Sequence, residues 1–203
     1  MHLVLSIISL LTMTLFTNEV EPKTIIFYGD SITAGYGVGT EFAFPELIRV
    51  QLDKNKFDIE VVNAGLSGET SAGGLTRIDW VLNREYDIFV LELGANDGLR
   101  GLPVTETEKN LQLIIDKVKI KYPETIIVLA GMMVPPNMGE NYTESFKQIY
   151  PRLARKNDAH IIPFILKDVA GIVELNQPDG IHPNTKGHEI IAKNLYPVFV
   201  ELL

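Results

Sequence analysis

Five short apolar segments, separated by longer amphipathic stretches, constrain the fold of this chain more than any other feature. Each is a continuous run rich in β-branched residues, which is typical of parallel strands covered on both faces. Strands that alternate with helices indicate an α/β fold with right-handed crossovers and a mainly parallel five-stranded sheet. The predicted strands are residues 24–28, 59–62, 87–93, 125–130 and 159–164.

Helical periodicity fills the stretches between the predicted strands. Residues 105–121 repeat apolar side chains at the spacing of one helix face, namely Leu111, Ile114, Ile115 and Val118. Thr105 and Glu108 have the spacing of a capping box at the start of that helix. Pro151 and Pro197 fall inside two later helical patterns, and we expect Pro151 to bend or interrupt the first of them.

Composition bounds the class of protein. The chain has 203 residues, of which 46% are hydrophobic and 22% charged, as in a soluble globular protein. A formal net charge of −8 with no run of Lys or Arg argues against nucleic-acid binding. No cysteine is present, which excludes disulfides, a thiolate nucleophile and a cysteine-based metal site. No linker-like stretch divides residues 21–203, so we predict one domain there.

The first twenty residues differ from the rest of the chain. Residues 3–16 are an apolar run of signal-peptide length, too short for a comfortable bilayer span. Only Met1 and His2 precede the run, and no A-x-A cleavage site follows it. We expect residues 1–20 to be a cleaved signal that exports the protein to the periplasm or the medium. The alternative is an N-terminal helix on a cytoplasmic protein.

The residues that carry chemistry fall in the loops after the predicted strands. In open α/β sheets, ligands bind outside the carboxyl ends of the strands. The loops there read "GDSITAGYG" from Gly29, "NAGLSGET" from Asn63, "GANDGLRG" from Gly94, "GMMVPPNMG" from Gly131 and "PDGIHPN" from Pro178. The predicted binding face is therefore this edge of the sheet.

Ser31 is the candidate nucleophile, because it follows a buried strand in a sharp turn. A serine hydroxyl needs a base, normally a histidine oriented by a third group. His182 lies in a loop, and Asp179 could turn back through Gly180 to accept a hydrogen bond from its ring. An ordinary Asp-Gly turn before a helix explains the same residues equally well.

The other histidines are weaker candidates. His2 lies in the predicted signal, and His160 lies in a predicted strand, where we expect a core residue with satisfied hydrogen bonds. His188 lies in the last helical pattern, where we expect it to face solvent or cap the helix. His182 is therefore the favoured base.

Acyl-bond hydrolysis also needs hydrogen-bond donors for a developing oxyanion. Gly68 could bring its backbone N–H close to a substrate, and Asn96 could supply a side-chain amide from a strand end. A simple turn at Gly68 and an Asx-turn at Asn96 are the structural alternatives. The joint occurrence of these residues on separate loops of one face favours the chemical interpretation.

Other nucleotide and hydrolase motifs do not fit. Gly35, Gly37 and Gly39 miss the G-x-G-x-x-G spacing, and no Walker A sequence occurs. Thr33 occupies the last glycine position of G-x-S-x-G, which argues against the α/β-hydrolase family proper.

The sequence resembles the SGNH (GDSL) hydrolases. Four blocks match in order, "GDS", "NAGLSGET", "GAND" and "DGIHP", and they span residues 24–203. "GDSITAGYG", "ELGANDGLRG" and "DGIHPN" are most similar to the bacterial acyl-thioesterase I, lysophospholipase and arylesterase subgroup. The resemblance implies a three-layer α/β/α, flavodoxin-like fold, with no metal and no organic cofactor.

The resemblance also implies a role for each matched residue. Ser31 is expected to be the nucleophile, His182 the general base and Asp179 its orienting partner. The expected oxyanion hole comprises the backbone N–H groups of Ser31 and Gly68 and the side chain of Asn96. The expected reaction is hydrolysis of a small-molecule acyl ester or thioester.

The acyl-binding residues are an inference from loop composition. Apolar side chains in two of the loops could form a flexible groove for acyl chains of short to medium length, namely Leu99, Leu102, Met132, Met133, Val134 and Met138. Leu99 and Val134 are the predicted substrate contacts. Alternatives to this function are a carbohydrate acetylesterase on the same fold, a binding module without turnover, and a metal-dependent phosphoesterase.

Overall fold

The predicted strands pair into one sheet in the computed structural model, which describes residues 22–203. The strand order is β2-β1-β3-β4-β5, and every pairing is parallel. The strands are β1 (Lys23–Gly29), β2 (Ile59–Asn63), β3 (Ile88–Glu92), β4 (Ile126–Ala130) and β5 (His160–Ile162). The predicted signal at residues 1–20 lies outside the described residues.

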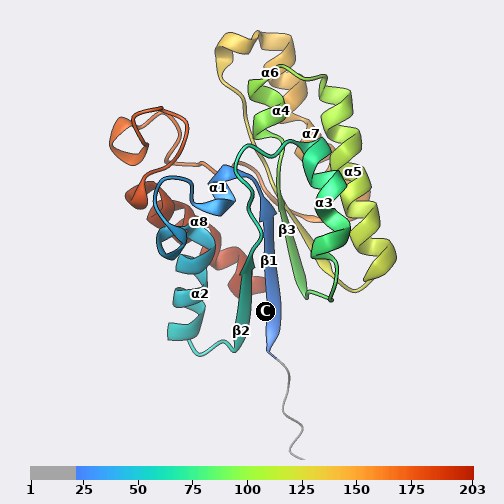
Figure 1. Ribbon diagram of the computed structural model, residues 1–203, viewed down its shortest axis with the longest axis vertical. Helices are drawn as coiled ribbons and strands as arrows, with labels where there is room; N and C mark the ends of the chain where they lie inside the picture. The colour runs from blue at the N-terminus through green and yellow to red at the C-terminus, as the bar shows by residue number, and fades with distance from the viewer. Residues whose placement is uncertain (1–21) are drawn as a thin grey trace, which may run out of the picture.

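Helices cover both faces of the sheet and give three layers (Figure 1). One layer contains α2 (Phe44–Lys54) and α8 (Thr185–Leu202), which pack against each other. The other contains α3 (Ser71–Val81), α5 (Val104–Lys121) and α7 (Ile149–Asn157). The remaining helical segments are α1 (Ser31–Ala34), α4 (Ala95–Leu99), α6 (Glu140–Lys147), η1 (Thr40–Phe42), η2 (Pro136–Met138) and η3 (Val173–Leu175).

Alternate side chains of β1 fill the core on each side of the sheet. Phe27 packs edge-on against Phe44 of α2 and Phe199 of α8. Tyr28 points to the other layer, where its hydroxyl donates to the backbone carbonyl of Gly74 in α3 at 2.6 Å. The continuous apolar runs are therefore strands buried on both faces, as predicted.

The capping box predicted at Thr105 is wrong. Helix α5 begins at Val104, with Pro103 as its cap residue and no side-chain capping bond. Glu108 instead pairs with Arg152 of α7, at 2.6 Å between guanidinium and carboxylate. The predicted interruption near Pro151 is confirmed, since α6 and α7 are separate helices. Pro151 lacks the N–H that would continue the ladder.

Two histidine predictions are also wrong. His160 is exposed, because β5 is the last strand of the sheet and leaves this side chain at the edge. His188 is buried between α8 and α2, where its Nδ1 accepts a hydrogen bond from the backbone N–H of Phe44 at 3.3 Å.

Within residues 22–203, no helix has the length and apolar character needed to cross a bilayer.

Candidate active site

The predicted nucleophile lies where β1 gives way to α1. The strand ends at Gly29, and Ser31 is the first residue of the helix. Asp30 caps that helix, because its carboxylate accepts a hydrogen bond from the backbone N–H of Ile32 at 3.0 Å. The side chain of Ser31 is largely buried, and the residue is 8% exposed.

His182 reaches Ser31 from a loop 151 positions further along the chain. Its Nε2 lies 2.9 Å from the Ser31 Oγ, and its Nδ1 lies 2.7 Å from an Asp179 carboxylate oxygen. A continuous chain of hydrogen bonds therefore runs from a carboxylate through an imidazole to a hydroxyl. The structure brings together the three residues that the sequence singled out.

A tight turn holds the carboxylate of Asp179. Its Oδ1 accepts backbone N–H bonds from Ile181 at 2.9 Å and His182 at 3.0 Å, with Gly180 between at a φ of +69°. The backbone bond from His182, then that from Ile181, then the imidazole contact hold the pKa of Asp179 at about 2. The carboxylate is thus ionised at neutral pH and favours a proton on Nδ1 of the ring, which leaves Nε2 free to accept.

Tyr36 is a site residue that the sequence analysis missed. Its ring lies against the imidazole of His182, with ring centroids 4.7 Å apart. Its backbone carbonyl accepts a hydrogen bond from the side chain of Gln177 at 2.6 Å, which joins the loop after α1 to the histidine loop. An aromatic residue in a glycine-rich turn carries no sequence signal for this contact.

Asn96 and Gly68 lie on neighbouring parts of the site. The side-chain amide of Asn96 donates to the backbone carbonyl of Glu69 at 3.1 Å and to the Asp30 carboxylate at 3.3 Å. Gly68 has a φ of +80°, a left-handed conformation that side chains rarely adopt. Asn96 therefore connects the nucleophile turn to the loop that contains Gly68.

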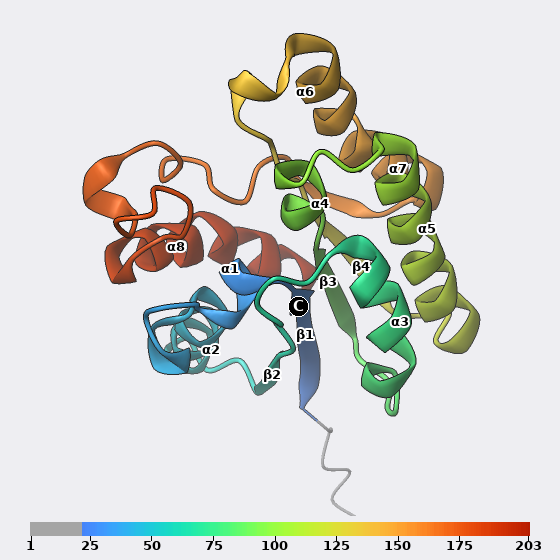
Figure 2. The same cartoon turned by 45° about the horizontal axis from the view of Figure 1, so that its top comes forward.

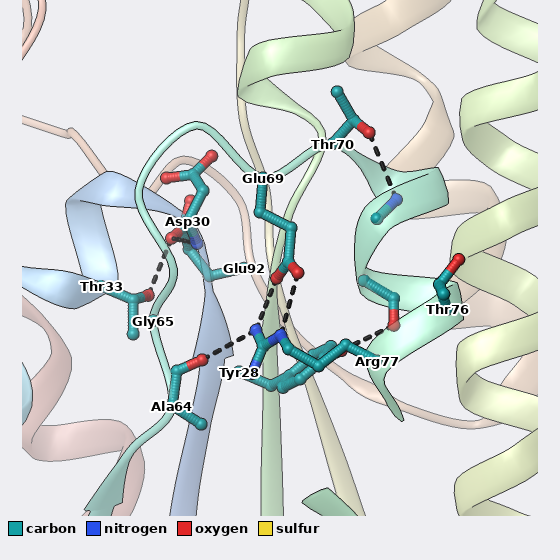
Figure 3. A network of polar contacts seen from close by, with 12 residues as sticks. Tyr28, Asp30, Thr33, Ala64, Gly65, Glu69, Thr70, Thr76, Arg77 and Glu92 are labelled. Atoms are coloured by element: carbon teal, nitrogen blue, oxygen red, sulfur yellow. Dashed lines mark hydrogen bonds and ion pairs between the residues drawn. The ribbon is translucent and has the colours of Figure 1, made fainter. Parts of the chain in front are cut away.

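The loop of residues 64–70 is held by an arginine of α3. Arg77 donates through Nε to the carboxylate of Glu69 at 2.9 Å and through Nη2 to the backbone carbonyl of Ala64 at 3.0 Å. The guanidinium also lies over the ring of Tyr28, 4.3 Å from its centroid (Figure 3). One side chain thus fixes both ends of the loop, a role that spacing in the sequence does not reveal.

Helix α4 is tied to the same loop and to α3. Buried Asp97 accepts hydrogen bonds from the backbone N–H of Ser71 at 2.7 Å and from its hydroxyl at 2.5 Å. Arg100 donates to the backbone carbonyl of Gly68 at 3.0 Å. Gly68 is therefore held through its backbone carbonyl.

An apolar cavity of about 440 Å³ adjoins the site. Its walls include Ile32, next to Ser31, and Ala95, next to Asn96. Both predicted substrate contacts, Leu99 and Val134, line it together with Met132 and Met133. Of the other predicted apolar residues, Leu102 and Met138 are absent from its walls.

A larger cavity of about 570 Å³ lies at the opposite edge of the sheet, where the strands begin. Its lining mixes opposite charges, including Lys23, Glu60 and Arg84, and it contains none of the predicted site residues.

Within residues 22–203, no cluster of three or more His, Asp or Glu residues is arranged to hold a metal ion. The chemistry-bearing residues are concentrated at the carboxyl edge.

A parallel α/β/α sheet with serine, histidine and carboxylate groups hydrogen-bonded at its strand ends is the architecture of a hydrolase. The chain belongs to the GDSL-like lipase/acylhydrolase family, whose family model matches residues 27–190. Curated relatives of the chain have the names esterase, thioesterase, lysophospholipase and arylesterase.

Two curated relatives cover most of the chain. Esterase TesA of Pseudomonas aeruginosa is 35% identical over 194 residues, which are 95% of this chain and 96% of that protein. Thioesterase 1/protease 1/lysophospholipase L1 of Escherichia coli K12 is 38% identical over 180 residues, 86% of this chain and 84% of that protein. Both fit the subgroup that the sequence resembles.

A solved structure supports the fold directly. The crystal structure of TesA superposes with a TM-score of 0.84 at 36% identity, over 89% of this chain and 100% of that one. The family and the three-layer fold expected from the sequence are therefore confirmed.

Proposed function

We propose that the protein hydrolyses carboxylic esters and thioesters of acyl substrates through an acyl-enzyme, with Ser31 as nucleophile, His182 as general base and Asp179 as the residue that orients the base. The hydrogen bonds of 2.9 Å and 2.7 Å that join these three side chains are the observation that carries the proposal. The esterase and thioesterase names of the relatives support both kinds of bond.

Four proton transfers at His182, two in acylation and two in deacylation, complete one turnover. Ser31 attacks the carbonyl carbon while Nε2 accepts its hydroxyl proton, and the imidazolium then protonates the leaving alcohol or thiol. Water attacks the acyl-serine with His182 again as base, which releases the acid and restores the hydroxyl. The ionised Asp179 stabilises the imidazolium formed in each step.

The oxyanion would lie among the backbone N–H groups of Ser31 and Gly68 and the amide of Asn96. Both hydrogens of that amide are engaged, at 3.1 Å to Glu69 and 3.3 Å to Asp30. We expect the longer bond, which goes to Asp30, to be exchanged for the oxyanion. Charge that develops in a site of fixed donors is stabilised without reorganising solvent.

The adjoining cavity would hold the acyl chain. Its apolar lining, which includes Leu99 and Val134, suits a hydrocarbon, and its two methionines adapt to chains of different shape. We therefore expect a preference for acyl chains of short to medium length. A carbohydrate acetylesterase would instead need polar groups for a sugar.

A substrate panel tests this function. Wild type, Ser31→Ala and the exposed helix control Ser145→Ala are assayed on p-nitrophenyl esters of increasing chain length, an acyl thioester, a lysophospholipid and acetylated xylan. We expect Ser31→Ala to lose about 10⁶-fold in kcat, with its melting temperature nearly unchanged, while Ser145→Ala keeps full activity.

Two outcomes would contradict parts of the proposal. Ester hydrolysis by Ser31→Ala at the wild-type rate would refute the nucleophile. Activity that peaks sharply at acetate esters, with acetylated xylan as the preferred substrate, would refute the acyl pocket and favour the carbohydrate acetylesterase.

Export remains a proposal from the sequence. The apolar run of residues 3–16 supports a signal peptide that leads to the periplasm or the medium. N-terminal sequencing of the protein recovered from cell fractions tests this. A chain that begins at Met1 and stays in the cytoplasm would contradict it.

A further inference from the structure

Two carboxyl side chains meet in the interior behind Ser31. Asp30 follows the end of β1, and Glu92 ends β3, which pairs with β1 so that Gly29 lies beside Glu92. Asp30 is 0% exposed and Glu92 is 1% exposed. Figure 3 shows these two residues together with Thr33, apart from the Arg77 cluster. Among residues 22–203, no lysine or arginine pairs with either carboxyl.

The donors around the pair show which oxygen can carry a hydrogen. Asp30 accepts from the backbone N–H of Ile32 and from the amide of Asn96, one on each carboxylate oxygen. The Oε2 of Glu92 accepts from the Thr33 hydroxyl at 2.7 Å and the backbone N–H of Asp30 at 3.3 Å. The Oε1 of Glu92 has no donor, and it is the one buried side-chain oxygen or nitrogen in residues 22–203 without a partner.

The close approach of these groups depends on the residue between them. A Cβ added at Gly29 would lie 2.2 Å from the Thr33 hydroxyl oxygen and 2.5 Å from the Glu92 carboxyl. Only glycine therefore leaves room for Glu92 to contact the nucleophile turn. The first residue of the "GDS" block accommodates this buried carboxyl.

Two adjacent negative charges cannot stay buried without a cation. Burial is the largest cause that raises the pKa of both groups, to about 6 for Asp30 and well above the ordinary value for Glu92. The charge of Asp30 raises the pKa of Glu92 further, whereas hydrogen bonding from the Glu92 side chain favours the ionised form of Asp30. The pair therefore keeps one proton at neutral pH.

We propose that Glu92 is a neutral carboxylic acid that donates the hydrogen on its Oε1 to the Asp30 carboxylate, and that it is thereby a positioning residue for Ser31 and Asn96. Its Oε2 holds the turn through Thr33 and the Asp30 backbone, while its hydrogen satisfies Asp30. Asp30 then keeps a donor when Asn96 turns toward an oxyanion. The roles of Ser31 and Asn96 rest on the proposed function, whereas the protonation of Glu92 does not.

Few other titratable groups face the pair. His182 approaches Asp30 from the histidine loop and favours the ionised form of Asp30. Tyr150 of α7, which donates to the backbone carbonyl of Leu93 at 2.9 Å, is neutral because burial raises its pKa. Asp97 of α4 lies near Tyr150 and is bound to Ser71. Glu92 is thus the group whose ionisation would disturb the turn as pH rises.

Carboxyl NMR tests the protonation without reference to activity. The protein is labelled with ¹³C at the glutamate δ-carboxyl carbon and titrated. At pH 7 we expect one resonance at the position of a protonated acid, absent from Glu92→Gln and retained in the exposed control Glu60→Gln. Ionised positions for every glutamate at pH 7 would overturn the proposal, even if Ser31 proves to be the nucleophile.

Kinetics test the positioning role. Glutamine at position 92 can accept from Thr33 and donate to Asp30 as the neutral acid does, whereas methionine has similar length and does neither. We expect Glu92→Gln to keep kcat within about tenfold of wild type, the equivalent of one hydrogen bond, and to lack a loss of kcat that the wild type shows at high pH. Glu92→Met is expected to lower kcat further with little change in KM. Equal losses of kcat in both variants would overturn the positioning role. If Glu92→Met does not fold, the carboxyl NMR experiment, which tests the protonation of Glu92, decides the proposal.

Discussion

Asp179 and Asp30 are both connected to Ser31, one through His182 and the other as its chain neighbour, but their surroundings are opposite. Asp179 lies in an exposed turn, where two backbone N–H bonds and an imidazole hold its pKa at about 2. Asp30 is buried beside a second carboxyl, and burial raises its pKa to about 6. The same type of side chain is therefore fully ionised at position 179, whereas at position 30 it belongs to a carboxyl pair that holds one proton.

This difference teaches that local donors, and not the residue type, set the charge of each group near the nucleophile. The exposed aspartate takes its donors from its own turn of residues 179–182. The buried one takes one donor from its own turn, the backbone N–H of Ile32, and another from Asn96 of α4, 66 positions away. A carboxylate that must stabilise a cation is ionised, whereas a carboxyl that holds a turn can be neutral.

Exchanging each aspartate for asparagine is the strongest way to break this comparison. Asp179→Asn removes the charge that stabilises the imidazolium and favours the wrong tautomer, so we expect a loss of up to about 10⁴ in kcat. Asp30→Asn still caps α1, because asparagine is a good capping residue, and it should lose far less. Steady-state kinetics on one ester measure both, and equal losses would contradict the separation of roles.

The oxyanion donor gives the next largest effect. Asn96→Ala is expected to lower kcat by about 10² to 10³ while the protein stays folded. The matched control is Asn194→Ala, because the Asn194 amide bonds only the backbone carbonyl of Lys167. A loss in kcat that Asn194→Ala shares would show that Asn96 acts only through stability.

The arginine that holds the loop of residues 64–70 should have a smaller effect. Arg77→Met removes the bonds to Glu69 and Ala64, and we expect kcat to fall about tenfold, the equivalent of one lost hydrogen bond to a charged group. Arg84→Met is the control, since Arg84 also pairs with a glutamate and lies over a tyrosine, but at the other edge of the sheet. Full activity of Arg77→Met would mean that the loop of residues 64–70 keeps its conformation without the hydrogen bonds from Arg77.

A buried histidine extends the comparison to a base. Burial lowers the pKa of His188 to about 4, from 6.5. Between pH 6.5 and 4, His188 therefore binds a proton in the unfolded chain but not in the folded chain. The free energy of unfolding falls as pH drops through this window, by about a few kcal/mol at most. His188→Asn keeps an acceptor for Phe44 but cannot titrate. Urea unfolding at pH 4 to 7 should show a flatter slope for this variant, and an unchanged slope would exclude His188 as the cause.

The features predicted from sequence are those that short stretches encode. The apolar run before Gly29 predicts both the strand and the turn that presents Ser31, and "DGIH" contains its own tight turn. Outside the motifs that carry the family resemblance, residues whose role depends on distant partners were missed or misplaced. Glu108 pairs with Arg152, 44 positions away, and His188 is buried by α2, 144 positions away. Glu92 also depends on distant partners, but the sequence does mark it, because it is a charged residue at the end of an apolar strand that is expected to be buried.

Covalent labelling tests the central claim most directly. The protein is treated with a fluorophosphonate, which reacts with an activated serine, and the modified peptide is identified by mass spectrometry. We predict one adduct on Ser31 in the wild type, formed much more slowly when His182 is replaced by alanine and absent from Ser31→Ala. An adduct on another residue, or equal labelling of Ser31→Ala, would contradict the account.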